Sequence, residues 1–357
     1  MTQQKKFYDV LDGLRGTAAA AIVMRHSGLY WISPFLLPSS YLAVDLFFVL
    51  SGFVLAHAYE ARFAAGMDLV EFIRVRVIRL LPLNLLGLLI GLLLYLGLQT
   101  VHHSSDFSTG FLIFTIVLNA FFLPMFPAWG VRSFSFPFNG PTWSLFFEMI
   151  VNVLFGATQK WLSLRVLFSV VGCAACALVA TSLFYGSLDE GIQWYGFPGG
   201  FARVMFSFPL GVVIYRCQHR ITPLHVNSWF LLGFLALILW MPVSNTVRPI
   251  YDLAAAIVIL PSLVALGARL EPTPSQSRIF TFLGRTSYAT YILHFPCVPL
   301  LGIAAHHVLG IDAQSLAPWS GVAFLGLVFL GAWIIDRMFD QPARKFLTRI
   351  GQQTTVS

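Results

Sequence analysis

Apolar segments recur along almost the whole chain, separated by short polar or basic stretches. Most are about 17 to 23 residues long, which is the length that an α-helix needs to cross the hydrocarbon core of a membrane. Ten of them are suited to span: residues 12–32, 41–59, 80–99, 142–158, 164–185, 200–215, 227–243, 250–268, 287–309 and 318–336. The pattern therefore predicts an all-α, polytopic bundle of about ten transmembrane helices.

An eleventh apolar segment, residues 110–126, is expected not to cross the membrane. It runs into a stretch rich in Gly, Pro and aromatic residues that continues to Pro141. Such interrupted backbone is tolerated at membrane depth only where protein shelters it. We therefore expect this segment to be re-entrant, interfacial or buried against other helices.

The positions of the basic residues support an even number of crossings. With ten spans, eighteen of the 22 Lys and Arg residues fall on one side, including Lys5, Lys6 and Lys345 near the termini. Cytoplasmic loops carry such an excess of positive charge. Both termini are therefore expected in the cytoplasm. The four residues on the other side are Arg25, Arg132, Arg203 and Arg248.

Composition limits what else the chain can contain. Hydrophobic residues make up 57% and charged residues only 10%, whereas about a quarter of a soluble domain is charged. We expect one integral membrane domain over residues 1–357, without a separate soluble domain. The net charge of +7 is scattered and assigned to topology, so nucleic acid is not expected as a partner. Cys173 and Cys176 lie among small apolar residues, which favours helix packing over a metal or redox site.

Ionisable residues stand inside the first apolar segment. Arg15 and His26 are eleven positions apart, close to three helical turns, so they share one face at a separation of roughly 16 Å along the axis. Asp12 is one turn before Arg15 and can pair with it. Charged groups in a spanning helix usually face a polar interior and indicate a site. His26 is a candidate general base; the alternative is a histidine that only hydrogen-bonds to a neighbouring helix.

The second and third segments add a carboxylate and a basic run. Asp45 lies at membrane depth in AVDLFFVLSGFVL, whose Ser51 permits close approach of a helix or a ligand. Arg74, Arg76 and Arg79 precede the third apolar segment. The planar fork of arginine matches phosphate oxygens, so these residues can bind a phosphorylated cofactor; lipid headgroups are the alternative.

Two later segments carry polar stripes. Ser144, Glu148 and Asn152 recur every four residues in PTWSLFFEMIVNVLF, which places them on one helix face. Ser287, Tyr291 and His294 are spaced i, i+4 and i+7 within GRTSYATYILHFP, which also places them on one helix face. An intramembrane carboxylate such as Glu148 handles protons, pairs with a cation or contacts a ligand.

These motifs together resemble acyltransferase family 3, a family of integral membrane acyltransferases. The matching features, in order, are DGLRG followed by His26, VDLFFVLSGF at 44–53, RVIR at 76–79, TWSLFFE at 142–148 and SYATYILHFP at 287–296. The resemblance covers residues 7–347. It implies transfer of an acyl group, most often acetyl, from acyl-CoA to a hydroxyl of a surface or secreted carbohydrate. It also implies the inner membrane of a bacterium and a role in the cell envelope.

We expect the following division of roles. His26 removes the proton from the acceptor hydroxyl or first carries the acyl group, Glu148 or Asp45 orients it, and Arg15 holds the donor or stabilises developing negative charge. Donor binding is assigned to Arg74, Arg76, Arg79 and Ser51. Substrate or structural roles are assigned to Asp12, Trp143, Ser144, Tyr291 and His294. No metal is expected; the expected partners are acetyl-CoA or another acyl-CoA, a carbohydrate acceptor, membrane lipid and proteins of polysaccharide synthesis.

Two other classes of protein fit parts of the pattern. A transporter or flippase of a polysaccharide precursor also has many spans with polar groups at membrane depth, although the sequence shows no inverted repeat. An assembly protein that has kept the fold and lost catalysis is the third class. The enzymatic interpretation requires a water-accessible passage through the bundle, with the imidazole of His26 projecting into it.

Overall fold

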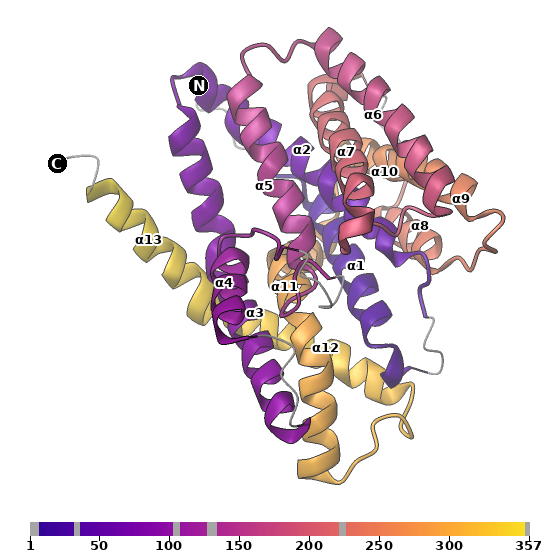
Figure 1. Ribbon diagram of the computed structural model, residues 1–357. Coiled ribbons are helices and arrows are strands. Elements are labelled where there is room, and N and C mark those ends of the chain that lie inside the picture. The colour runs from indigo at the N-terminus through magenta and orange to yellow at the C-terminus, as the bar shows by residue number, and fades with distance from the viewer. Residues whose placement is uncertain (1–6, 32–35, 103–107, 127–133, 221–225, 354–357) are drawn as a thin grey trace.

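The computed structural model describes residues 7–31, 36–102, 108–126, 134–220 and 226–353 (Figure 1). All the regular secondary-structure elements within these ranges are helices. The long helices are α1 (Asp9–His26), α2 (Ala43–Ala64), α3 (Leu69–His102), α5 (Thr142–Thr158), α6 (Leu164–Tyr185), α7 (Phe197–Cys217), α11 (Pro274–Leu309) and α12 (Trp319–Ile335). The shorter ones are α4 (Thr109–Ala120), α8 (Ser228–Trp240), α9 (Arg248–Ala254), α10 (Leu260–Gly267) and α13 (Gln341–Gln353). The expected all-α class is confirmed.

Seven helical stretches of the described chain are long and apolar enough to cross a membrane. They are Ser40–Ala64, Leu69–Thr100, Leu164–Tyr185, Trp194–Arg220, Arg248–Gly267, Pro274–Val308 and Trp319–Gly351. These stretches support an integral membrane protein, but the expected number of about ten spans is not confirmed. The basic residues Lys5, Lys6 and Arg132 lie outside the described residues, and the orientation stays a prediction.

Three of the ten expected spans are not among these seven stretches, two because of their length and one because of its charge. Helix α5 has 17 residues and α8 has 13, about 26 and 20 Å at 1.5 Å per residue, against a hydrocarbon core of about 30 Å. Helix α1 has 18 residues but includes the charged Asp9, Asp12, Arg15 and Arg25. The twelve residues of α4, in the segment expected not to cross, reach only about 18 Å.

Helix α1 lies in the interior of the bundle, packed along α11 and against α2 and α8. Gly16 makes the approach to α11 possible, because a Cβ there would lie 2.3 Å from Cβ of Leu283. Gly52 of α2 has the same effect against α7, where a Cβ would lie 2.0 Å from the carbonyl oxygen of Phe208. Small residues allow such close contact between helices in membranes. The two contacts fix the close packing of α1 on α11 and of α2 on α7.

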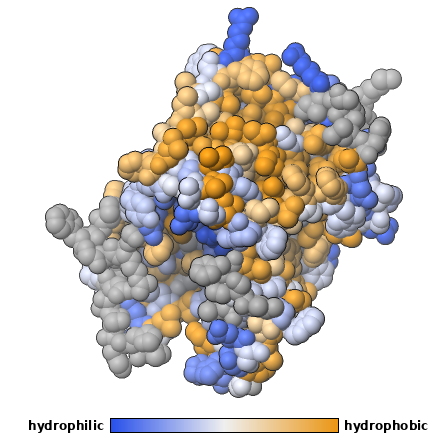
Figure 2. Space-filling view, turned by 90° about the vertical axis from the view of Figure 1, so that its right-hand side faces the viewer, coloured by the Kyte–Doolittle hydropathy of each residue, from blue (hydrophilic) through white to orange (hydrophobic). Residues whose placement is uncertain are grey.

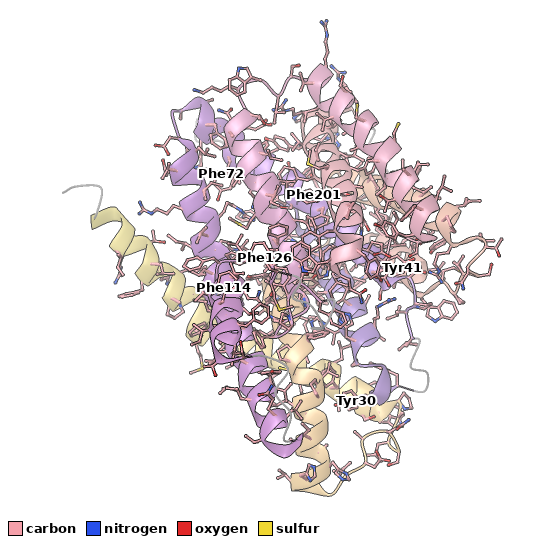
Figure 3. All side chains as sticks on the ribbon, viewed as in Figure 1. Tyr30, Tyr41, Phe72, Phe114, Phe126 and Phe201 are labelled. Carbon is pink, nitrogen blue, oxygen red and sulfur yellow. The ribbon has the colours of Figure 1, made fainter. Side chains whose placement is uncertain are left out.

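The outer surface is strongly apolar. On α6, Phe168, Leu183 and Phe184 are exposed, and the side of the molecule that carries α6 and α9 shows a broad hydrophobic area (Figure 2). Cys173 and Cys176 are free cysteines on the exposed surface of α6. Aromatic side chains fill the bundle from one end to the other, with Phe72 near one end and Tyr30 near the opposite end (Figure 3). This distribution is typical of a protein whose solvent is lipid.

Two helices are widened locally. Residues Ala255–Ile259 continue α9 into α10 as a π-helix, and Asp336–Asp340 connect α12 to α13 in the same way. Such π-helical turns often occur near functional sites. In the second, Asp336 and Asp340 pair with Arg344 at 3.3 and 2.5 Å.

Candidate active site

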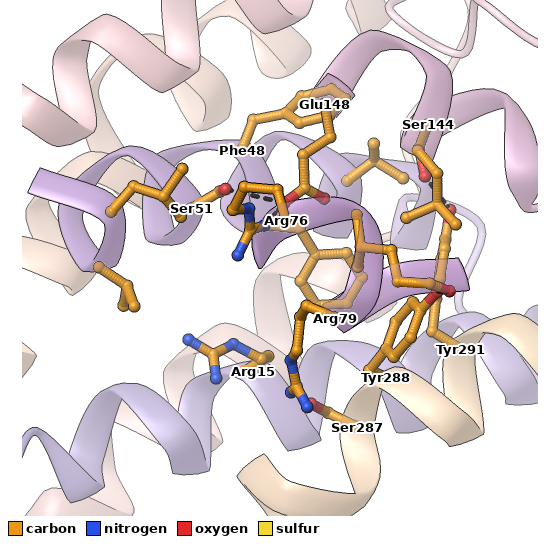
Figure 4. A pocket seen from close by; sticks show the side chains of 16 residues that line it. Arg15, Phe48, Ser51, Arg76, Arg79, Ser144, Glu148, Ser287, Tyr288 and Tyr291 are labelled. Atoms are coloured by element: carbon orange, nitrogen blue, oxygen red, sulfur yellow. Dashed lines mark hydrogen bonds and ion pairs between the residues drawn. The ribbon is translucent and has the colours of Figure 1, made fainter. Parts of the chain in front are cut away.

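A cationic cavity opens among α1, α2, α3, α5 and α11, and we call it the arginine cavity (Figure 4). Its charged lining residues are Arg15, Arg76, Arg79 and Glu148. Its other polar lining residues are Ser51, Ser144, Ser287, Tyr288 and Tyr291. The three arginines outnumber the single carboxylate, so the described lining carries an excess of positive charge suited to an anion such as a phosphate group.

Glu148 is the hydrogen-bond centre of the arginine cavity. Its Oε1 accepts from a terminal nitrogen of Arg76 at 2.7 Å and from Oγ of Ser51 at 3.0 Å. Of the three roles that the sequence leaves open for Glu148, the structure shows a pair with a cation, Arg76. No described contact joins Glu148 to His26.

The basic run of α3 divides between two directions. Arg76 and Arg79 are three residues apart and line the cavity together, and the guanidinium of Arg79 lies 6.0 Å from the centre of the Tyr288 ring. Arg74 is rotated by about 200° from Arg76 on a helix. It lies against Gly351 of α13, where a Cβ would be 2.1 Å from the guanidinium. Arg74 is thus not among the residues that line the cavity.

The predicted pair on α1 is formed. Arg15 donates to Oδ1 of Asp12 at 2.9 Å, and both side chains are partly exposed. Asp12 in turn packs on α11, because a Cβ on Gly284 would lie 2.3 Å from its Cβ. Asp12 therefore holds the guanidinium of Arg15 at the lining of the arginine cavity.

A second cavity lies at the other end of α1, and we call it the histidine cavity. Its lining residues are Ile22, Arg25, His26, Tyr41, Val44, Pro141, Trp143, Asp189, Glu190, Ile192, Gln193, Tyr195, Tyr291 and Phe295. Val44 and Tyr291 line both cavities. The hydroxyl of Tyr291 lies 2.8 Å from Oγ of Ser144. Val44 and Tyr291 therefore lie between the two cavities, and His26 projects into one of them. The continuous passage that the enzymatic interpretation requires stays a prediction.

His26 is oriented by a second histidine. Its Nδ1 lies 2.8 Å from Nε2 of His294, and the two rings are nearly parallel, with 5° between their planes. His294 is fully buried, and its own Nδ1 lies 2.7 Å from the carbonyl oxygen of Tyr291. His26 is exposed to the cavity.

This chain of hydrogen bonds assigns the protons on both rings. A carbonyl oxygen only accepts, so Nδ1 of His294 must donate to Tyr291. In a neutral ring the other nitrogen then accepts, and Nδ1 of His26 must be its donor. The lone pair of His26 is left on Nε2, the nitrogen that a general base needs.

Asp45 has a different partner from the one expected. It is fully buried and binds Arg203 of α7 through three contacts of 2.8, 3.1 and 3.3 Å. Arg203 also donates to the carbonyl oxygens of Tyr41 and Glu190, each at 2.8 Å. No described contact joins Asp45 to His26, so the orienting contact comes from His294 in place of the two carboxylates.

Arg203 is a residue whose importance the sequence analysis missed. It is the largest side chain that is fully buried, at 1% exposed, and its guanidinium lies 5.5 Å from the centre of the Trp143 ring. The signal was available, because Arg203 is a single charge within an apolar segment and Asp45 is another. Two opposite intramembrane charges usually pair.

Comparison with known proteins identifies the type of domain. The family model described as an acyltransferase domain matches residues 8–337. "Protein 2 in picA locus" of Rhizobium radiobacter is 37% identical over 190 residues, which is 48% of this chain and 93% of the relative. A "Putative O-acetyltransferase" of Staphylococcus aureus strain COL is 22% identical over 96% of this chain and 58% of its own length.

A further relative is the "Peptidoglycan O-acetyltransferase OatA" of Listeria monocytogenes, 22% identical over 96% of this chain and 56% of its own length. The chain thus spans somewhat more than half the length of the O-acetyltransferases that it matches. No solved structure matches.

Proposed function

Because this chain belongs to the acyltransferase family that its residues 8–337 match, we propose that it is a membrane O-acyltransferase acting between acyl-CoA and a carbohydrate hydroxyl. Acetyl is the acyl group we propose, since two of the relatives are named O-acetyltransferases. The observation that carries the proposal lies on one helix: α1 presents Arg15 to a cationic cavity and His26, with a free lone pair, to an adjoining cavity.

The arginine cavity is the proposed donor site. Its guanidinium groups bind the phosphates of acetyl-CoA, because a partly desolvated arginine forms strong charge-assisted hydrogen bonds with phosphate oxygens. Glu148 pairs with Arg76 and Asp12 pairs with Arg15, so Arg79 is the arginine of the described lining without an ion pair. The long pantetheine arm then leads the thioester toward Tyr291, where the cavities adjoin. With the orientation predicted from the basic residues, the donor enters from the cytoplasm across a bacterial inner membrane.

His26 is the proposed general base. Its Nε2 takes the proton of the acceptor hydroxyl while the oxygen attacks the thioester carbonyl carbon. A carbon–oxygen bond forms, the carbon–sulfur bond breaks, and the leaving thiolate of CoA receives the proton from the imidazolium. His294 accepts a hydrogen bond from Nδ1 throughout and stabilises the imidazolium that forms, as an orienting partner does in hydrolytic triads. A positioned base contributes typically about 10²- to 10⁴-fold in rate.

The proposed acceptor is a hydroxyl group of a cell-envelope glycan. Proteins of polysaccharide synthesis deliver this glycan to the enzyme. The relative from Listeria acts, by its name, on peptidoglycan. The histidine cavity supports an acceptor of this type because it is large, partly polar and adjoins the base.

The test is transfer of label from radioactive acetyl-CoA by the purified protein in lipid nanodiscs, with glycan fragments from its own host as acceptors. His26→Ala is expected to abolish the transfer. His306→Ala is the matched control, because His306 is an exposed histidine near the end of α11 whose ring makes an edge-to-face contact with His307. Full transfer by His26→Ala, or no transfer by the unmodified protein to any host glycan, would overturn the proposal.

A further inference from the structure

The two cavities carry opposite charge. The arginine cavity is lined by three arginines and one glutamate. The charged residues among the described lining of the histidine cavity are Arg25, Asp189 and Glu190. Arg25 pairs with Asp189 at 2.6 Å. Glu190 is therefore the charged side chain of this described lining that has no ion-pair partner.

The carboxylate of Glu190 is available to a ligand. It is half-buried, and within the described part of the chain no hydrogen bond or ion pair engages its oxygens. It lies close to the backbone of Gly196, where a Cβ would be 2.0 Å from Oε2. A carboxylate in this position can accept hydrogen bonds from a ligand that enters the cavity.

The loop that carries Glu190 is held in place by buried polar groups. The carbonyl of Glu190 accepts from Arg203 at 2.8 Å, and the amide of Leu188 donates to the fully buried Asp252 at 2.8 Å. Gly191 has a φ of +123° and packs on Trp143, where a Cβ would lie 2.4 Å from the ring. The intramembrane pair of Asp45 and Arg203 thus serves to hold this loop beside the base.

Aromatic surfaces complete the cavity. Trp143, Tyr195 and Phe295 line it together with Glu190 and His26. Flat aromatic surfaces beside one carboxylate suit a sugar ring, which offers an apolar face and hydroxyl groups at its edge. A carboxylate accepts from two hydroxyls at once through charge-assisted hydrogen bonds. It also repels a ligand that carries its own carboxylate or phosphate, because like charges placed close together oppose binding.

We propose that the histidine cavity is a subsite for a glycosyl unit without an acidic substituent, bound through its hydroxyls to Glu190. This inference rests on the proposed function and adds a rule of acceptor choice to it. The two substrates are sorted by charge: the anionic donor is drawn to the arginines of one cavity, and Glu190 keeps anions out of the other. They meet at Tyr291, which lines both.

The experiment follows binding without acyl transfer. The protein in nanodiscs is treated with diethyl pyrocarbonate, and the modification of His26 is timed by mass spectrometry in the presence of methyl β-glucopyranoside or its uronic acid, methyl β-glucopyranosiduronate. The two probes share one ring and differ in one carboxylate. The modification rate of His306, measured in the same samples, corrects for any general effect of the sugars on the reagent.

The glucoside is expected to protect His26 in a saturable way, and the glucuronide to protect it at least about 10-fold less effectively. In Glu190→Gln, protection by the glucoside weakens about 10-fold or more and the difference between the two probes disappears. The control variant Glu71→Gln changes an exposed acid at the start of α3. It should leave unchanged both the protection by the glucoside and the difference between the two probes.

Equal protection by the two probes in the unmodified protein, or no protection by the glucoside at its highest soluble concentration, would overturn the inference. Neither result depends on a variant that must fold. Since the assay needs no acetyl-CoA, failure of label transfer in the unmodified protein would overturn the proposed function instead, and the two failures are distinguishable.

Discussion

Nδ1 of His26 lies 2.8 Å from Nε2 of His294, so a ring at the end of α1 is oriented by a buried ring of α11. The close packing of the two helices at Gly16 makes this contact possible. The bond sets which nitrogen of His26 carries the proton. The account of catalysis depends on it.

Replacing His294 should therefore act on turnover. His294→Leu removes the acceptor for Nδ1 of His26, so kcat is expected to fall about 10²-fold or more while KM for acetyl-CoA is unchanged. His294→Gln keeps an acceptor oxygen near the position of Nε2 and should restore part of the loss. Steady-state kinetics of the two variants in nanodiscs provides the measurement. Equal kcat in the two would show that His294 only fills space.

The arginines should act on donor binding. Arg76→Gln and Arg79→Gln each remove a charged hydrogen-bond donor from the arginine cavity, a loss of about 1.5 to 3 kcal/mol. KM for acetyl-CoA should rise about 10- to 100-fold in each. Arg74→Gln should change it little, because Arg74 lies against α13. An equal rise in all three would assign the effect to overall charge near the membrane.

Asp45 should matter for stability, as half of a buried ion pair. Asp45→Asn leaves Arg203 buried without its counter-charge, and such a break costs about 3 to 5 kcal/mol. The double variant Asp45→Asn with Arg203→Gln should be more stable than Asp45→Asn alone, since it removes the uncompensated charge. Thermal unfolding in detergent gives the comparison. If Asp45→Asn unfolds at the temperature of the unmodified protein, the pair does not hold the loop.

Acceptor affinity should depend on pH through Glu190. Burial and the nearby Asp189 raise the pKa of Glu190 above its ordinary value, while Arg203 acts in the opposite direction; Tyr195 is the other titratable neighbour. Because the pKa is raised, the carboxylate is lost at a higher pH than for an ordinary glutamate as the solution is acidified. KM for the acceptor should therefore rise on acidification, and this rise should be absent in Glu190→Gln. A rise of equal size in Glu190→Gln would assign the titration to another group.

Much of the fold follows from periodicity, and its limits have physical causes. The length and apolar character of the segments predict an all-helical membrane protein. The length of the apolar segments alone does not fix the number of spans, because α5 and α8 are shorter than a usual spanning helix and α1 is interrupted by charge. The family match decides in favour of an enzyme over a transporter or flippase, a choice that the hydrophobic pattern left open.

The site could be predicted as a set of helix faces but not as a set of contacts. Helical spacing places Arg15 with Asp12 and Arg76 with Arg79, because these pairs lie within one turn. It cannot show that His26 meets His294, 268 residues away, or that Asp45 meets Arg203, 158 residues away. Those contacts depend on which helices pack together. The assignment of Glu148 or Asp45 as the partner of His26 chose a carboxylate by analogy, whereas the structure supplies an imidazole.

The most direct measurement is the protonation of the two ring nitrogens of His26. Solid-state NMR of protein labelled with nitrogen-15 at histidine, with His26 assigned by comparison with His26→Ala, distinguishes a protonated from an unprotonated nitrogen. The account predicts that, in the neutral ring, Nδ1 carries the proton and Nε2 does not. A proton on Nε2 of the neutral ring would contradict it, because the nitrogen required to act as the base would then have no lone pair to use.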